Sequence, residues 1–130
     1  MFAAKPKSMT LTLRVLARLL SYPDAALRAH LDEMRDALRA EQALSAPRLA
    51  EIEALIASIA RQSAIDAEAD YVQLFDSGRS TSLHLFEHVH GDSRDRGPAM
   101  IDLVRTYEQA GLFLGEGQMP DHLPVVLEYA

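Results

Sequence analysis

Residues 82–103 read SLHLFEHVHGDSRDRGPAMIDL, and this stretch contains the end of one helical pattern and the start of another. Its first part spaces four apolar residues as on one helical face: Leu83, Leu85, Phe86 and Val89. Gly91 follows them, and glycine commonly takes the left-handed conformation just after a helix. Gly97-Pro98 then suits a helix start, because proline is tolerated in the first turn. The stretch therefore predicts a short helix over 82–90 and another from 97 to about 110.

Helical patterns with recognisable start residues also occur before and after this stretch. Asp24, Ser45 and Asp121 each stand where a side chain can cap a helix, and Pro47 fits a first helical turn. Apolar residues at helical spacing predict further helices over 9–22, 24–38, 46–60, 64–76 and 121–130. Sustained alternation typical of strands is missing from the sequence. We therefore predict an all-α fold, one compact domain of about six to seven helices over residues 1–130.

The composition limits the classes of function. The chain has 130 residues, of which 48% are hydrophobic and 25% charged, and its net charge is −6. Such an acidic chain is a poor nucleic-acid binder, because phosphate binding needs a clustered basic surface. It has no cysteine, so disulfides and thiolate metal sites are excluded. The start, MFAAKPKSM, has too short an apolar stretch for a signal peptide. No apolar run in the sequence approaches the roughly 20 residues that a membrane span needs. We expect a cytoplasmic protein without a membrane span.

His84, Glu87 and His88 form the pattern H-x-x-E-H, which is a zinc-peptidase signature. On a helix the two histidines would share one face, with the glutamate beside them as general base. The pattern lies opposite the apolar face, however, and a third zinc ligand is not evident. Its downstream candidates stand outside any motif: Glu108, Glu116 and Glu128. A metal-dependent hydrolase using these three residues stays an alternative to plain surface histidines.

Two other features carry both a structural and a functional interpretation. His122 follows the capping Asp121, and a helix N-terminus disfavours the charged form of a histidine. This pair is either ordinary helix-start chemistry or a terminus that contacts a peptide or an anion. The charged run Arg94-Asp95-Arg96 is either a solvated loop or the polar rim of a groove. Tyr71, Phe75 and Tyr107 have the spacing of core aromatics, and each tyrosine hydroxyl needs a polar partner if it is buried.

Four stretches together resemble one family: YVQLFD (71–76), residues 82–103, YEQAGL (107–112) and MPDHLPVVLEYA (119–130). They are similar to the NarJ-type assembly chaperones of respiratory nitrate reductase, also called its delta chain. This family belongs to the wider group of redox-enzyme maturation chaperones. The match is dense over 71–130, whereas the N-terminal half resembles the family only in its short helices and the segment LLSYPD (19–24).

The resemblance implies an all-helical chaperone and not an enzyme. Such a chaperone binds the N-terminal peptide of the catalytic alpha subunit, assists insertion of the molybdenum cofactor, and has no cofactor or metal of its own. It also implies that the H-x-x-E-H letters belong to the chaperone signature. Family members continue past residue 130, so we expect their C-terminal helices to be missing here and the last helix to favour homo-oligomers. A structural helical subunit that stays in the complex is the other alternative.

A peptide of this kind mixes apolar and basic residues, so its groove needs aromatic pockets with acidic groups and a polar rim. The residues expected to form that peptide-binding groove are Tyr71, Phe75, Phe86, Glu87, His88, His90, Arg94, Arg96, Tyr107, Asp121, His122 and Glu128.

Overall fold

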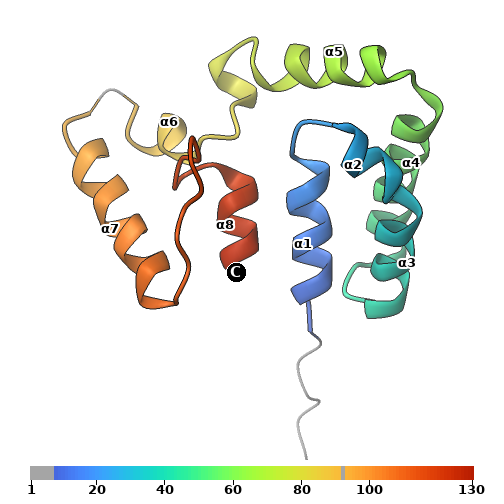
Figure 1. The fold of residues 1–130 in the computed structure, drawn as a ribbon, viewed down its shortest axis with the longest axis horizontal. Coiled ribbons are helices and arrows are strands. Elements are labelled where there is room, and N and C mark those ends of the chain that lie inside the picture. The colour runs from blue at the N-terminus through green and yellow to red at the C-terminus, as the bar shows by residue number, and fades with distance from the viewer. Residues whose placement is uncertain (1–7, 92) are drawn as a thin grey trace, which may run out of the picture. The chain divides into compact units, whose positions relative to one another are not determined.

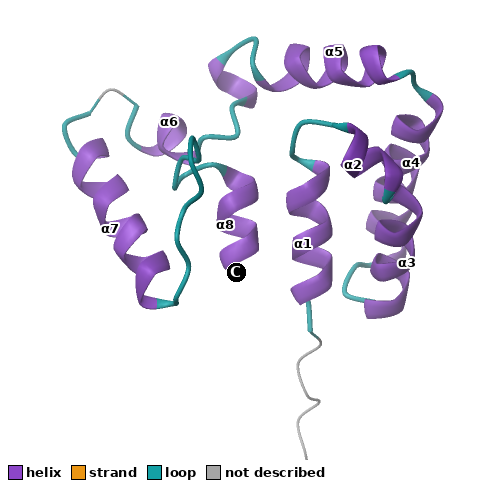
Figure 2. Cartoon of the chain, viewed as in Figure 1, coloured by secondary structure: helices purple, strands orange, loops and turns teal. Residues whose placement is uncertain are grey.

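The structure is a computed structural model that describes residues 8–91 and 93–130. Over these residues it contains eight α-helices, one short 3₁₀ helix and no strand (Figures 1 and 2). The all-α prediction is confirmed, with more helices than the six to seven expected. The prediction that MFAAKPKSM is not a signal peptide concerns mainly residues 1–7, which lie outside the described residues.

Two compact units divide the chain, one ending at Glu68 and the other beginning at Ala69. We describe each unit by itself, so the expectation of a single domain over 1–130 stays a prediction. Within the described residues, no helix combines the length and the apolar character that crossing a membrane requires.

The first unit contains α1 (Thr10–Leu19), α2 (Ala25–Ala29), α3 (Leu31–Glu41), α4 (Ala46–Arg61) and the start of α5 (Ala64–Phe75). Helix α1 packs against α3, and α3 packs against α4 (Figure 1). Their apolar faces form one core, as the helical spacing predicts. Its buried members are Val15, Leu19, Leu27, Leu31, Met34, Leu38 and Ile56.

The helix starts in this unit follow two different rules. Asp24 and Ser45 cap α2 and α4 as predicted: the Asp24 carboxylate accepts a hydrogen bond from the Leu27 amide at 2.8 Å. At helix α1 the N-cap residue Met9 makes no side-chain cap hydrogen bond, and the flanking Ser8 hydroxyl accepts only from the Thr10 amide, at 3.4 Å. The α1 amides at Leu11 and Thr12 donate to the Glu41 carboxylate, at 3.0 and 2.7 Å, from the end of α3. A local sequence pattern cannot reveal that second kind of cap.

The second unit contains the rest of α5, a 3₁₀ turn at Arg79–Thr81, α6 (Leu85–Val89), α7 (Arg96–Gln109) and α8 (Leu123–Tyr129). After α7 the chain returns to the start of α6 before α8 begins (Figure 1). There the amide of Leu123 donates to the carbonyl of Leu83 at 2.8 Å. His84 and His122 form an isolated antiparallel bridge at the same place. This return positions the residues of the candidate site.

Four local predictions were wrong. The helix expected over 24–38 is broken at His30, which separates α2 from α3. The helix expected over 82–90 begins only at Leu85, with His84 in extended backbone before it. Val89, expected on the buried face, is 70% exposed. Asp121 does not cap the last helix either, because His122 occupies the N-cap position of α8.

Candidate functional site

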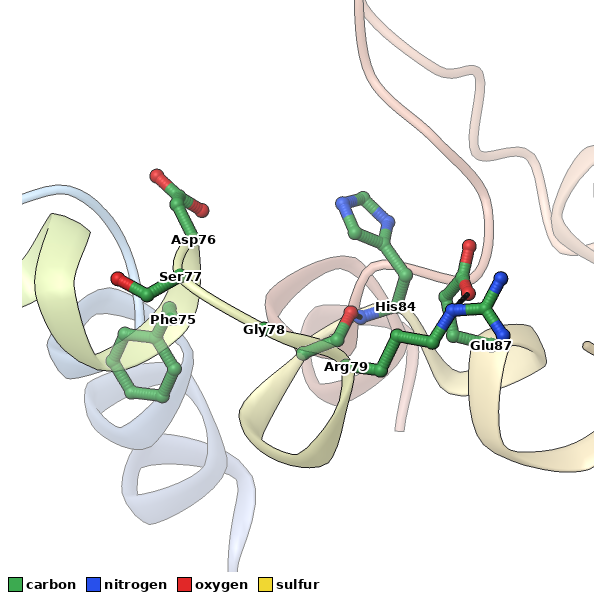
Figure 3. A pocket seen from close by; sticks show the side chains of 8 residues that line it. Phe75, Asp76, Ser77, Gly78, Arg79, His84 and Glu87 are labelled. Atoms are coloured by element: carbon green, nitrogen blue, oxygen red, sulfur yellow. Dashed lines mark hydrogen bonds and ion pairs between the residues drawn. The ribbon is translucent and has the colours of Figure 1, made fainter.

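An open pocket of about 450 Å³ lies in the second unit, between the end of α5 and the start of α6 (Figure 3). Phe75 and Asp76 come from the α5 end, and His84 and Glu87 from the α6 side. The 77–82 loop supplies the remaining lining: Ser77, Gly78, Arg79 and Ser82. The pocket therefore combines one aromatic wall with charged groups of both signs.

Glu87 is the best-anchored charged group of the pocket. Its carboxylate oxygens lie 3.7 Å from Nε of Arg79 and 3.1 Å from a guanidinium nitrogen of Arg96. Figure 3 shows the Arg79 side chain reaching toward it. Arg96 also donates to the carbonyl of Gly91, at 3.4 Å. Glu87 thus joins the 77–82 loop, α6 and the start of α7, and its carboxylate already has two cationic partners.

Two aromatic residues extend the apolar wall along α5. The rings of Tyr71 and Phe75 lie 4.9 Å apart between centroids, in a tilted arrangement. Burial, and to a smaller extent the charge of Asp76, raises the pKa of the Tyr71 hydroxyl. The tyrosine therefore stays neutral at physiological pH and offers an apolar surface with a polar tip.

Asp121 is fully buried beside the pocket. Its Oδ2 accepts a hydrogen bond from the Phe86 amide at 3.1 Å, and its carbonyl accepts one from the Leu85 amide at 3.0 Å. Its Oδ1 has no hydrogen-bond partner and faces Nδ1 of His84 at 3.6 Å. Because a helix leaves its first amides without internal partners, Asp121 acts as the cap of α6 from 35 residues away.

The His84 ring at this contact also stacks on a second histidine, His122. The imidazoles of His84 and His122 are stacked, with centroids 5.0 Å apart and an interplanar angle of 25°. Burial lowers the pKa of His122, the His84 charge lowers it further, and Asp121 and Asp76 oppose both effects. The predicted direction is confirmed, but burial is the main cause rather than the helix terminus.

Tyr107 fixes the same loop from α7. It is buried, and its hydroxyl donates to the carbonyl of Pro120 at 2.7 Å. Burial raises the pKa of this hydroxyl, with smaller contributions from Asp121 and Tyr129. The Tyr129 ring packs on it at 5.2 Å. The sequence-based expectation that a buried tyrosine hydroxyl needs a partner is met here.

The remaining predicted residues lie around α6 or away from it. His88 makes a 2.9 Å contact through Nε2 with the Ser82 carbonyl, and the His90 ring packs edge-on against Phe86. Arg94 and Glu128 are exposed. The structure thus brings Phe75 and Glu87 into one pocket and places their predicted companions next to it, behind it or outside it.

The hydrolase alternative has no geometric support. His84 precedes α6 while His88 lies within it, so the two do not share a helical face. Their ring nitrogens contact different groups, the Asp121 carboxylate and the Ser82 carbonyl. Across residues 8–91 and 93–130, no cluster of three or more His, Asp or Glu side chains is arranged to hold a metal ion.

Asp76, Arg79 and Ser82 were not among the predicted site residues. The SGRST segment at 77–81 is recognisable from sequence as a loop, and loops on a helical scaffold often carry binding residues. Nothing in the sequence shows that this loop folds back against Glu87, because that contact depends on the tertiary arrangement.

Comparisons with known proteins agree with the sequence resemblance. The chain is 50% identical over 115 residues to the nitrate reductase molybdenum cofactor assembly chaperone NarJ of Escherichia coli K12, covering 88% of this chain and 49% of that protein. It is 40% identical to the probable chaperone NarW of the same organism, over 90% and 48% of the two chains. It is 32% identical to the probable chaperone NarJ of Bacillus subtilis, over 92% and 64%. The chain thus spans about half the length of the two Escherichia coli relatives.

A solved structure with a similar fold is a putative redox enzyme maturation protein from Archaeoglobus fulgidus. The TM-score is 0.66 at 19% identity, over 98% of this chain and 73% of that one. This likeness supports the helical fold. The family model described as nitrate reductase delta subunit matches residues 21–130. The chain belongs to the nitrate reductase delta subunit family.

Proposed function

We propose that this protein is an assembly chaperone of a respiratory nitrate reductase, and not an enzyme. The observation that carries the proposal is the 50% identity to a nitrate reductase molybdenum cofactor assembly chaperone over 88% of the chain. In this proposal the protein works in the cytoplasm, binds the N-terminal peptide of the catalytic alpha subunit, and holds that subunit while the molybdenum cofactor is inserted.

The pocket between α5 and α6 is the proposed contact site for the peptide. Phe75 and the neighbouring Tyr71 offer an aromatic wall, and Asp76 and Glu87 bring carboxylates to its rim. Apolar anchors with acidic groups nearby suit a peptide that mixes apolar and basic residues. The net charge of −6 attracts a basic peptide and so increases its association rate. Because Glu87 already has two arginine partners, Asp76 is the acid better placed to receive a new cation.

Two buried residues stabilise the backbone next to the pocket. Tyr107 and Asp121 are buried and engaged with neighbouring backbone groups, so their proposed contribution is to hold the walls. Contacts with single lining residues are made by His88, His122 and Arg96. Phe86 and His90 pack on each other. Direct contact of these five residues with the peptide stays a prediction. The same holds for Arg94 and Glu128.

Calorimetry with a synthetic N-terminal peptide of the alpha subunit tests the proposal. Phe75→Ala removes the aromatic wall and should weaken binding at least about tenfold, because truncated anchors commonly cost ~2 kcal/mol. Phe113→Ala is the matched control. It removes the same side chain from a position that is 77% exposed and does not line the pocket.

The outcomes separate the site from the function. Equal binding by the two folded variants would place the peptide elsewhere on the protein. No binding by the wild-type chain would argue against the peptide-binding function for this chain. Co-purification then distinguishes the chaperone from a structural subunit: we expect the protein to be released from mature nitrate reductase, whereas a structural subunit would remain in the active enzyme.

A further inference from the structure

Helix α6 depends on another part of the chain for its start. It has only five residues, and its N-cap residue His84 makes no side-chain cap hydrogen bond. So short a helix does not persist by itself, because the first turn costs more conformational entropy than its hydrogen bonds return. The amides of its first two residues, Leu85 and Phe86, both donate to Asp121. One residue of the returning loop therefore satisfies both.

Asp121 cannot act as a surface contact in this arrangement. Its side chain is completely buried, one carboxylate oxygen is engaged by the Phe86 amide, and the other faces His84. The returning loop is itself fixed by the Leu123–Leu83 backbone hydrogen bond. A ligand in the pocket would meet the residues that Asp121 holds rather than Asp121 itself.

Two of those residues line the pocket. His84 immediately precedes the capped amides of Leu85 and Phe86, and Glu87 immediately follows them. The position of both relative to Phe75 on α5 thus depends on the cap. We propose that Asp121 is a positioning residue: by capping α6 from the 119–122 loop, it holds His84 and Glu87 in the pocket. The consequence for peptide affinity rests on the proposed function of that pocket.

Three variants separate positioning from direct contact. Asp121→Ala removes the acceptor for the Phe86 amide. Asp121→Asn keeps an oxygen acceptor of the same shape and removes the charge, so it preserves the cap. Asp102→Ala is the matched control, because it removes an exposed carboxylate from α7.

In the free protein, amide hydrogen exchange measured by NMR reports on the cap. Asp121→Ala should speed exchange at Phe86 about fivefold to tenfold, the size expected for a lost helix cap, and should shift the His84 and Glu87 resonances. Asp102→Ala should leave all these signals close to wild type. Asp121→Asn should leave the Phe86 exchange and the Glu87 resonances close to wild type, while the loss of the charge 3.6 Å from Nδ1 of His84 shifts the His84 resonances directly. The exchange of core amides in α3 should not change in any of the three variants, which distinguishes local loosening from global unfolding.

Calorimetry with the alpha-subunit peptide measures the consequence for binding. Asp121→Ala should weaken binding by about the same factor, while Asp121→Asn and Asp102→Ala bind like wild type. The proposal is overturned if Asp121→Ala leaves Phe86 exchange unchanged, or speeds it without changing the Glu87 resonances. It is also overturned if Asp121→Asn loses binding while Phe86 stays protected, since the charge itself would then make the contact.

Two further outcomes are also decisive. If Asp121→Ala does not fold, the comparison of Asp121→Asn with wild type decides, because only the positioning role predicts both a protected Phe86 amide and retained binding. If wild type does not bind the peptide, the proposed function fails. The exchange and resonance data on the free protein then judge the positioning role alone.

Discussion

Removal of the Tyr107 hydroxyl should destabilise the second unit although it removes only one non-hydrogen atom. The hydroxyl donates to the Pro120 carbonyl at 2.7 Å in a buried place. A net hydrogen bond contributes roughly 0.5–1.5 kcal/mol, and a buried acceptor left without a donor costs roughly 1–3 kcal/mol. Tyr107→Phe keeps the ring, so the packing on Tyr129 remains. We expect the free energy of unfolding to fall by about 1–2 kcal/mol.

Urea unfolding followed by far-ultraviolet circular dichroism measures this change. With a typical dependence on urea, the loss corresponds to a midpoint lowered by roughly 0.5–1.5 M. Tyr129→Phe is the matched control, because that side chain belongs to a residue that is 42% exposed, and it should unfold close to wild type. Equal midpoints for Tyr107→Phe, Tyr129→Phe and wild type would refute the view that this hydrogen bond stabilises the loop before α8.

Three further changes test other parts of the structure. His122 has a lowered pKa in the folded protein, so the unfolded chain binds more protons below about pH 6.5, the ordinary pKa of histidine. The free energy of unfolding should therefore fall as the pH drops below about 6.5. His122→Gln should flatten this pH dependence in urea titrations repeated at several pH values. Leu38→Ala should cost about 2–5 kcal/mol in thermal unfolding, because Leu38 is 1% exposed, whereas Leu55→Ala, at 44% exposure, should cost far less. Gly91→Ala should lower the melting temperature, since Gly91 has a φ of +53°, while Gly97→Ala, within α7 and with open space around it, should raise it slightly.

The parts of the fold that depend on neighbouring residues could be predicted from the sequence. Asp24 and Ser45 each accept from an amide three residues later, so the helix starts that they cap are local facts. The continuous spacing of Leu27, Leu31 and Met34 predicted one helix, because apolar periodicity continues across the break at His30. Periodicity reports which face is buried and does not report where the backbone turns.

The candidate site was harder to predict because its contacts span long stretches of chain. Asp121 was expected to cap the last helix, which was wrong, because the helix that it caps begins at Leu85. Glu87 was predicted as an acid of the peptide groove, and only the structure shows that it lines this pocket and that Arg79 and Arg96 share its carboxylate. Residue chemistry indicates what a side chain can do, and the tertiary fold decides which partner it meets.

The distance between α6 and its cap also orders events during synthesis. The Phe86 amide and the Asp121 carboxylate that receives it are 35 residues apart. At about 5–20 residues per second, a ribosome adds those residues in roughly 2–7 s. During that interval the nascent chain carries the sequence of α6 without the group that stabilises its first turn. In the first unit, by contrast, Glu41, which caps α1, is synthesised before any residue of α6. The pocket is therefore completed late on the ribosome, after the α1–α4 core is already available to fold.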